Sequence, residues 1–578
     1  MDNSPISHEP QAGAGSREGA ERQAPPETFN ISSLMTRVAG RTPERTAVNN
    51  RRGPDCLGRT RITYAELDRD SDVLGAALAA GPLRPGDRVV VMAPPGPDFF
   101  VTIFGLFKAG LVPVMVDPGM GLKKMLSCLA EGQAAGLVGV KLAHLASLIL
   151  PRYFVGLKYR LTIGRPLFWG GDSLAALLAK GDRGPEGALP APTLASDTAA
   201  VLYTSGATGP AKGTIYTHSM FRAQVGLIGG AFEMRDGGVD LSTFPLFSLF
   251  TSALGLTAVI PNMNPVKPGS ADPRKLTQTI VEEKCTSVFA SPALLSRLAG
   301  YLRENDVKLE LLDRVISAGA PIKPQIAVDF AAALAPGGRL WTPYGATEGM
   351  PLTSIEAAEI AEVRGMTEQG FGVCLGRPLP GHKMAVIAIT DNQLGSFSAK
   401  SILPMGEVGE IVASGPVVAE KYFQRPRETE MSRVTGPDKA FWRRMGDLGW
   451  QDAQGRVWFC GRKSQRVVAE KAVFYTVSCE AIFNNHPRVR RSALVGVGPA
   501  GGATPAMIIE PESRLNKKQW AAMVEELKAL GRSNPRTRAI DCFLPHRNFP
   551  VDIRHNAKIN REKLSRWAAA RLHKQDFV

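Results

Sequence analysis

Residues 201–214 read VLYTSGATGPAKGT, an apolar run that leads into a loop of hydroxyl residues, glycines and one lysine. The apolar run predicts a buried strand. Glycines let the loop turn successive N–H groups inward as an anion nest, to which hydroxyl and ammonium groups add donors. The spacing is not that of a Walker A loop, and on composition alone an ordinary turn is the alternative. We predict a phosphate site formed by Thr204, Ser205, Gly206, Thr208, Gly209 and Lys212.

The chain on both sides of this loop alternates between strand-like and helix-like patterns. A Thr-x-x-Glu capping box at Thr63 predicts the start of a helix. Short β-branched runs predict buried strands, and longer apolar-periodic runs between them predict helices, which together indicate parallel sheets and an α/β fold. The predicted strands are 88–92, 111–116, 286–290 and 312–317, and the predicted helices are 99–109, 292–305 and 324–335.

The remaining segments predict two further units and a tail. Short strands over 384–389 and 409–413 indicate a β-rich subdomain, and a helix, a strand and a helix beyond residue 462 indicate a small C-terminal α+β domain. Residues 1–27, rich in Gly, Ala, Pro and Glu, are typical of a disordered tail. We expect an N-terminal domain over 28–463 and a C-terminal domain over 464–578.

Composition excludes several classes of protein. With 44% hydrophobic and 21% charged residues, the 578-residue chain has the composition of a globular protein. Seven scattered cysteines without a C-x-x-C pair, and no secretory signal, favour a reducing cytoplasm. The apolar stretches 99–116 and 244–260 are better explained as core than as membrane spans. No nucleic-acid signature accompanies the net charge of +15, most of which lies in the last 98 residues.

The loop at 203–213 resembles the signature loop of the adenylate-forming superfamily, which includes acyl-CoA synthetases, peptide-synthetase adenylation domains and luciferases. The resemblance continues in order from about residue 30 to about residue 570. It implies ATP and Mg²⁺ as cofactors, a large N-terminal domain of α/β subdomains with a β-rich subdomain, and a small mobile lid. In this family the lid rotates about a hinge, which corresponds here to Ser464.

Further motifs of the family identify candidate site residues in this sequence. In the segment YGATE at 344–348, the resemblance implies that Tyr344 stacks on adenine, Thr347 contacts the α-phosphate and Glu348 binds Mg²⁺. The segment SAGAP at 317–321 resembles the adenine-stacking backbone. The other implied roles are adenine contact for Gly319, Ala320 and Pro321, ribose binding for Asp447 and its companion Arg462, and adenylation catalysis for the lid lysine, Lys558.

Two positions depart from the pattern of acyl-CoA synthetases. Ser248 replaces a gating histidine in the motif PLFS at 245–248. The loop 465–475 lacks the glycine that lines the pantetheine path and carries Lys471 at about its position. A bulky residue there weakens the expectation that CoA accepts the acyl group.

The segments WTPYGATE, FPLFSLF and FPVDIRHNAKI most resemble the β-lactone synthetases of bacterial long-chain olefin pathways. This likeness implies adenylation of a 2-alkyl-3-hydroxy fatty acid, after which its own hydroxyl closes a β-lactone and expels AMP. The residues 244–260 and 288–295 would border the acyl pocket. His218, His382 and His555 are candidates for the base by residue type alone, with structural roles as the alternative.

Two other interpretations stay open. A fatty-acyl-CoA synthetase or fatty-acyl-AMP ligase would share the adenylation half and differ in the acceptor. A non-catalytic acyl- or nucleotide-binding scaffold is the third, and the joint presence of Lys212, Glu348, Asp447, Arg462 and Lys558 argues against it. The basic C-terminal region is expected to help attract ATP and to dock acidic partner enzymes of the same pathway.

Overall fold

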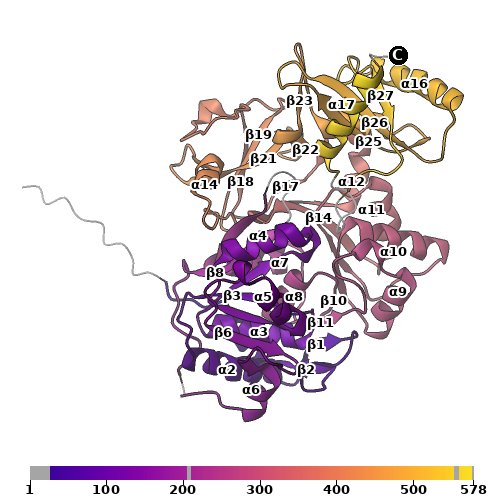
Figure 1. Ribbon diagram of the computed structural model, residues 1–578. Helices are drawn as coiled ribbons and strands as arrows, with labels where there is room; N and C mark the ends of the chain where they lie inside the picture. Colours follow the sequence, from indigo (N-terminus) through magenta and orange to yellow (C-terminus); the bar gives the residue numbers. More distant parts are fainter. Residues whose placement is uncertain (1–26, 186, 205–209, 552–558, 576–578) are drawn as a thin grey trace, which may run out of the picture.

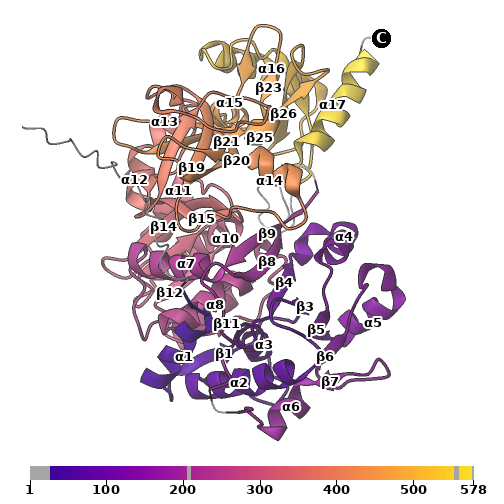
Figure 2. The ribbon, with the colours of Figure 1, turned by 90° about the vertical axis from the view of Figure 1, so that its left-hand side faces the viewer.

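The computed structural model describes residues 27–185, 187–204, 210–551 and 559–575. Two large sheets with flanking helices form the body of the molecule, and a β-rich sheet and the C-terminal unit lie together at one end of it (Figures 1 and 2). The α/β prediction is confirmed. The predicted tail lies outside the described residues except for Glu27.

The first sheet has seven strands in the order β7-β6-β5-β3-β4-β8-β9. All neighbouring strands are parallel except β8 and β9, which are antiparallel. The strand predicted at residue 201 is β8, and it ends at Thr204, where the predicted phosphate loop begins. The bounds are β3 Arg88–Met92, β4 Val112–Val116, β5 Gly136–Val140, β6 Tyr159–Ile163, β7 Asp172–Ser173, β8 Thr198–Thr204 and β9 Lys212–Thr217.

The second sheet has nine strands in the order β17-β15-β14-β13-β12-β10-β11-β1-β2. Its centre, from β14 to β1, is parallel, and β15, β17 and β2 are antiparallel edges. The bounds are β1 Thr46–Asn50, β2 Arg61–Thr63, β10 Val239–Ser242, β11 Thr257–Ile260, β12 Ser287–Ala290, β13 Arg314–Ser317, β14 Arg339–Ala346, β15 Gly349–Glu356 and β17 Arg377–Pro378.

Helices join the two sheets into one core. The nearly wholly buried helix α3 packs with residues of β8 and β11 in a single apolar cluster. Helix α2 begins with the predicted capping box, in which the Thr63 hydroxyl and the Glu66 carboxylate each accept a backbone N–H. The bounds are α1 Ser32–Arg41, α2 Tyr64–Ala80, α3 Pro97–Lys108, α4 Leu122–Gly132, α5 Lys141–Ile149, α6 Leu174–Lys180, α7 His218–Ala231, α8 Pro245–Leu254, α9 Pro273–Glu282, α10 Pro292–Glu304, α11 Pro324–Ala331, α12 Ala357–Glu362 and α13 Arg364–Glu368.

The predicted β-rich subdomain is an antiparallel sheet of six strands, ordered β16-β22-β21-β19-β18 with β20 paired to β21. Strand β21 is long and carries Asp447, and its neighbour β22 ends at Arg462. The bounds are β16 Val373–Cys374, β18 Lys383–Ile387, β19 Gly409–Ser414, β20 Arg433–Thr435, β21 Phe441–Gln451, β22 Val457–Arg462 and α14 Pro426–Ser432.

The C-terminal unit has its own three-stranded sheet, β25-β26-β27, and apolar clusters of its own. It docks on the large domain through α15, which packs against β22, and Asn485 Nδ2 donates to the Glu368 carbonyl at 2.8 Å. The bounds are β23 Val467–Val468, β24 Val473–Phe474, β25 Val489–Val497, β26 Thr504–Pro511, β27 Cys542–Pro545, α15 Thr476–Phe483, α16 Lys517–Arg532 and α17 Arg561–Gln575.

The apolar stretches are core, as expected. Residues 244–260 divide into α8 and β11, because Gly255 takes a left-handed conformation with φ +78° and ends the helix. In residues 99–116, the buried Lys108 lies in α3 and pairs with Asp68 and Asp72, each at 2.6 Å. Among the described residues, none of the helices combines the length and apolarity that crossing a membrane requires. The helix predicted over 324–335 is shorter in the structure, where α11 ends at Ala331.

A buried ion-pair network connects the β-rich sheet to the chain segment that precedes the C-terminal unit. Glu410 of β19 is fully buried and pairs with Arg444 at 2.7 Å and with Lys463 at 3.0 Å. Removing one member of a buried network leaves the opposite charges without compensation.

We expect Glu410→Leu to lower the free energy of unfolding by about 3–5 kcal/mol, since Arg444 and Lys463 lose their shared carboxylate. Denaturant titration followed by tryptophan fluorescence measures it. The matched control is Asp391→Asn, which removes the exposed partner of Arg466 and should cost less than about 1 kcal/mol. Equal effects of the two variants would contradict the role given to Glu410.

Candidate active site

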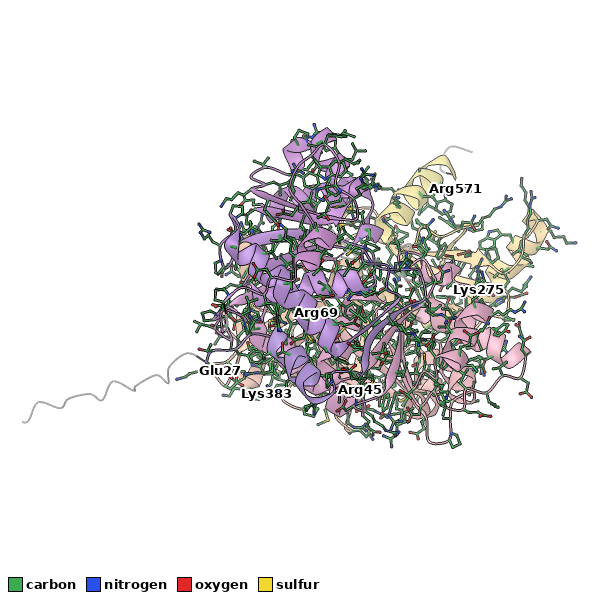
Figure 3. The ribbon with its side chains drawn as sticks, turned by 90° about the horizontal axis from the view of Figure 1, so that it is seen from below. Glu27, Arg45, Arg69, Lys275, Lys383 and Arg571 are labelled. Carbon is green, nitrogen blue, oxygen red and sulfur yellow. The ribbon has the colours of Figure 1, made fainter. Side chains whose placement is uncertain are left out.

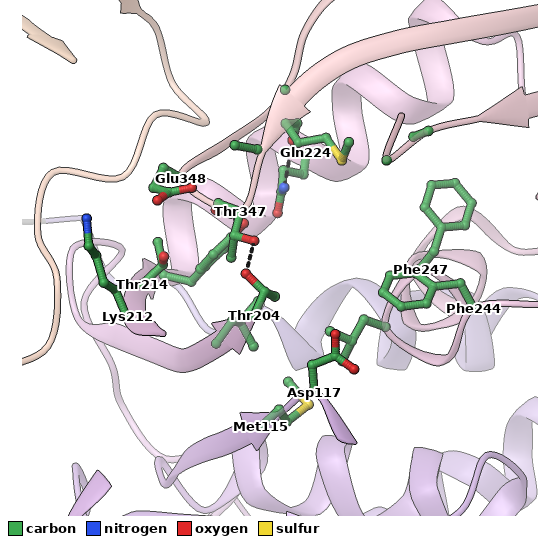
Figure 4. Close-up of a pocket in the computed structure, with 18 of the residues that line it drawn as sticks. Met115, Asp117, Thr204, Lys212, Thr214, Gln224, Phe244, Phe247, Thr347 and Glu348 are labelled. Atoms are coloured by element: carbon green, nitrogen blue, oxygen red, sulfur yellow. Dashed lines mark hydrogen bonds between the residues drawn. The ribbon is translucent and has the colours of Figure 1, made fainter. Parts of the chain in front are cut away.

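A cavity of about 770 Å³ lies between the two large sheets and the β-rich sheet. Its wall contains polar side chains from the ends of β8, β9 and β14, and apolar side chains from α7 and α8 (Figure 4). The two kinds of lining are separated: charged and hydroxyl groups occupy one part, and phenylalanines another. The cavity therefore suits a ligand with one highly polar and one apolar end.

The polar end contains four predicted residues that the structure describes. Thr204 and Thr347 meet across the cavity wall, with their hydroxyl oxygens 2.6 Å apart (Figure 4). Lys212 lies on the same wall, its ammonium 4.9 Å from the ring centre of Tyr422. The fourth residue is Glu348. Ser205, Gly206, Thr208 and Gly209 lie outside the described residues.

Glu348 is held by groups that keep its carboxylate ionised. The Tyr422 hydroxyl donates to Glu348 Oε1 at 2.5 Å, and the buried Arg443 stacks 4.5 Å from the Tyr422 ring centre. Burial favours the neutral acid, but the charge of Arg443 and the Tyr422 hydrogen bond outweigh it and lower the pKa of Glu348. An ionised carboxylate beside a phosphate site suits Mg²⁺, which commonly takes one or two carboxylates together with substrate phosphates.

Asp447 and Arg462 form an ion pair beside the same cavity; Arg462 lines it, whereas Asp447 and Tyr344 do not belong to its lining. Arg462 Nη1 lies 3.0 Å from Asp447 Oδ1, and the Tyr344 hydroxyl donates to Asp447 Oδ2 at 2.6 Å. Burial raises the pKa of the Asp447 carboxyl, and the Arg462 charge and the Tyr344 hydrogen bond only partly oppose this. Two carboxylate oxygens can accept two neighbouring hydroxyls, as on a ribose.

The predicted adenine segment reaches the cavity with part of its length. Gly319 lines it with φ +100°, a conformation that residues with a side chain rarely adopt, so the backbone can approach a flat ligand. Ala318 lines the cavity beside it. Ala320 is half-buried and Pro321 is exposed, and neither belongs to the cavity lining.

Aromatic residues of the 244–260 and 288–295 segments form the apolar end, as predicted. The rings of Phe247 and Phe289 stack with centres 4.2 Å apart, and Phe250 contacts Phe247 edge-on. Leu246, Leu249 and Ala253 add aliphatic surface from the same helix, α8.

The polar residues singled out near this end have structural partners. Ser248 is fully buried, and its hydroxyl donates to the Pro245 carbonyl at 2.5 Å within the first turn of α8. His218 Nδ1 accepts the Ile31 N–H at 3.2 Å, and burial lowers the pKa of this imidazole to about 4. His382 contacts the Pro380 carbonyl at 3.1 Å. Neither histidine belongs to the cavity lining, and His555 lies outside the described residues.

The lid lysine, Lys558, also lies outside the described residues. Val551 and Ile559, which flank the segment that contains it, form an antiparallel bridge. The predicted hinge residue, Ser464, lies in a short 3₁₀ turn and lines the cavity. Lys471 is exposed between β23 and β24 and is not part of the cavity lining. The domain boundary at 463/464 stays a prediction.

Sequence reasoning missed several residues of the site. Tyr422 and Arg443 hold Glu348, and the Tyr216 hydroxyl donates to the Thr347 carbonyl at 2.5 Å. Asp117 lines the cavity where β4 ends, and its backbone N–H donates to the Tyr203 carbonyl of β8 at 3.0 Å. The only available signal was the position of Asp117 directly after a predicted strand, where sites of α/β folds are found.

A family model described as AMP-binding enzyme matches residues 35–423. The chain belongs to this family. Two curated relatives are named olefin beta-lactone synthetase. The one from Xanthomonas campestris pv. campestris is 42% identical over 93% of this chain and 97% of its own length. The one from Stenotrophomonas maltophilia is 42% identical over 94% of this chain and 99% of its own length.

Solved structures of more distant relatives have the same fold. An amide bond synthetase from Marinactinospora thermotolerans superposes with a TM-score of 0.75 at 23% identity, over 93% of this chain and 99% of its own. ATP-bound MatB from Rhodopseudomonas palustris gives 0.74 at 20% identity, over 94% and 99%. The predicted superfamily is confirmed, and the chain is an AMP-forming ligase rather than a non-catalytic scaffold.

Many basic residues of the C-terminal unit are paired within that unit. Glu526, Glu510 and Glu480 lie 2.5, 2.6 and 2.7 Å from arginines in these pairs. Arg571 instead lies on α17 at the periphery of the molecule and stacks on Trp567 (Figure 3). Part of the positive charge is thus neutralised internally, and the docking of acidic partners stays a prediction. The arginines paired in this way are Arg488, Arg491 and Arg561.

The raised pKa of Asp447 predicts a pH effect on ATP binding. As the pH falls, this carboxyl gains its proton earlier than an ordinary aspartate and loses acceptor capacity for ribose, so the KM for ATP should rise. Tyr344→Phe removes a hydrogen bond that lowers the pKa, so the rise should begin at higher pH. At neutral pH the KM of Tyr344→Phe for ATP should exceed that of the unmodified chain roughly tenfold or more, because the Asp447 carboxylate loses one charge-assisted hydrogen bond.

Steady-state kinetics measured from neutral pH downward detects this effect. The matched control is Tyr159→Phe, which removes a Tyr–Asp hydrogen bond to Asp172 outside the cavity. It should leave the KM for ATP and its pH profile unchanged. An unshifted profile in Tyr344→Phe would contradict the assignment of ribose to Asp447.

Proposed function

We propose that this protein adenylates the carboxylate of a long-chain 2-alkyl-3-hydroxy fatty acid with ATP and then closes it to a β-lactone, releasing diphosphate and AMP. The supporting observation is one cavity whose polar end fits a nucleotide and whose other end is lined by phenylalanines. Two curated relatives that match over nearly the full chain are named olefin beta-lactone synthetase.

In the first step, a substrate carboxylate oxygen attacks the α-phosphate and diphosphate leaves. Thr204 and Thr347 would donate to phosphate oxygens, and Lys212 would offset their charge. Mg²⁺, held by Glu348 and the phosphates, would neutralise further charge. Lys558, carried by the lid, would donate to the oxygens on which charge builds. Among the described residues, no cluster of three metal-binding side chains exists, so the phosphates would supply the other ligands.

In the second step, the 3-hydroxyl oxygen bonds to the acyl carbon, the bond from that carbon to AMP breaks, and the hydroxyl proton passes to a base. The nucleophile is already part of the substrate, so no second substrate needs to enter. Correct orientation of an intramolecular nucleophile can supply on the order of 7–11 kcal/mol. The strain of the four-membered ring consumes part of this gain.

Asp117 is the carboxylate best placed to take this proton. It lies next to Thr204, at the ends of neighbouring strands β4 and β8, and across the cavity from Phe244 and Phe247 (Figure 4). The carbon bearing the 3-hydroxyl is two bonds from the acyl carbon, so it must sit between the phosphate site and the alkyl site. Asp117 occupies that boundary.

The test of the overall function is mass spectrometry of products formed from ATP, Mg²⁺ and a synthetic 2-alkyl-3-hydroxy fatty acid, with and without CoA. We expect a product lighter than the acid by one water, formed equally without CoA. Acyl-CoA formed only when CoA is present would instead identify a fatty-acyl-CoA synthetase, and acyl-AMP as the end product would identify a fatty-acyl-AMP ligase.

Variants of the lid lysine control this experiment. Lys558→Ala should slow the formation of AMP roughly 10²- to 10³-fold, as for the loss of one preorganised donor. Lys563→Ala, which removes an exposed lysine nearby on α17, should have no effect. Full activity of Lys558→Ala would disprove its catalytic assignment.

Asp117→Asn separates the two steps. Loss of a general base typically costs about 10²- to 10⁴-fold, so lactone release should fall while ATP–diphosphate exchange is retained and acyl-AMP accumulates. Asp272→Asn is the matched control, because both aspartates cap a helix by accepting a backbone N–H. Equal loss of exchange and lactone formation in Asp117→Asn would show a structural role instead.

A further inference from the structure

One edge of the large domain exposes an unusual concentration of apolar side chains. Helix α5 and the loops on either side of β6 carry large side chains that are 39–78% exposed. Phe168 is 78% exposed and Leu142 is 73% exposed, although each belongs to a residue type normally found in the core. We name this surface the α5 patch; it consists of Leu142, Leu145, Ile149, Val155, Leu167 and Phe168.

The members of the α5 patch come from α5, from the loop that follows it and from the loop after β6. Leu142, Leu145 and Ile149 have the spacing of residues on one side of a helix. The opposite side of α5 is buried through Ala143, His144 and Ser147. The His144 ring stacks on Trp169, with ring centres 5.4 Å apart, and Trp169 neighbours Phe168 in the loop between β6 and β7. This stacking attaches the loop to the helix.

The chain segment that carries the α5 patch is basic. Between Glu131 and Asp172 the chain carries five Lys and Arg residues and no Asp or Glu. Four of the five are exposed. The acidic groups that face this segment are Asp87, 3.9 Å from Lys158, and Asp172, which accepts the Tyr159 hydroxyl. The basic residues are Lys141, Arg152, Lys158, Arg160 and Arg165.

We propose that the α5 patch docks this protein on the surface of an anionic lipid bilayer. Apolar side chains flanked by Lys and Arg bind membranes by inserting at the boundary between headgroups and acyl chains while the cations pair with anionic headgroups. An acidic protein would satisfy the charges, but it would also need a complementary apolar surface. An anionic bilayer supplies both the negative charges and the apolar phase over its whole surface.

The location of the patch suits this role. Helix α5 lies on the outer flank of the large domain, away from α15, α16 and α17 of the C-terminal unit (Figure 2). Docking would also bring the protein to a phase in which apolar acyl substrates concentrate.

The test is co-sedimentation of the full chain with vesicles, without ATP or acyl substrate. Vesicles of phosphatidylcholine and phosphatidylglycerol should bind the protein, and vesicles of phosphatidylcholine alone should bind it at least tenfold less. The triple variant Leu142→Ser, Ile149→Ser, Phe168→Ser should lose binding at least tenfold. A second variant, Lys141→Gln, Arg152→Gln, Arg165→Gln, should weaken binding to the anionic vesicles and remove its dependence on salt.

The matched control is Val281→Ser, Leu311→Ser, Met405→Ser, three apolar residues of comparable exposure elsewhere on the surface. It should bind vesicles like the unmodified chain. The single change Phe168→Ser, at the most exposed position, serves if the triple variant does not fold. Retained activity on detergent-dispersed acid should accompany the loss of binding, since none of the patch residues lines the cavity.

Three results would overturn the proposal. The first is no binding of the unmodified chain to anionic vesicles. The second is equal binding by the patch variant and the control variant. The third is concentration-dependent self-association that the patch variant abolishes, without vesicle binding, which would make the patch an interface between copies of this chain. Because no reaction is measured in the vesicle assay, its outcome is independent of the proposed function.

Discussion

The carboxylate of Asp447 is the constraint around which the nucleotide end of the cavity is organised. It is buried, and it is held by Tyr344 from β14 and by Arg462 from β22. These contacts attach the second large sheet to the β-rich sheet at the point where both border the cavity. A buried carboxylate without partners would cost much free energy of folding. The need for both partners of Asp447 therefore also constrains how the two sheets lie relative to each other.

The pKa of a second carboxylate, Glu348, is shifted in the opposite direction. Its pKa is lowered by Arg443 and Tyr422, whereas burial dominates at Asp447 and raises the pKa there. The first arrangement favours a permanently charged ligand for a cation, and the second favours an acceptor of neutral hydroxyls. The two carboxylates thus suit the two kinds of recognition that the proposed magnesium nucleotide would require, and the aromatic end of the cavity is left to the proposed acyl chain.

Local patterns in the sequence predicted much of the fold. The Thr63 capping box, the strand ending at Thr204 and the division of the chain into α/β and β-rich parts all follow from neighbouring residues. The contacts of Tyr422 and Asp117 could not be predicted, because each joins segments far apart in the chain. Helix α11 ends early for a related reason: in place of a final turn, backbone hydrogen bonds join Ala333 to Leu309 and Ala335 to Leu312.

The Glu410 network has a consequence for how the C-terminal unit turns. Lys463 directly precedes the predicted hinge residue and is anchored to the β-rich sheet through Glu410. Any rotation must therefore begin after Lys463, and Arg462 stays with the large domain. The proposed ribose contacts would then be stationary during a rotation of the C-terminal unit. A bound nucleotide would keep its position in the large domain, and only the groups that the C-terminal unit presents to it would be exchanged.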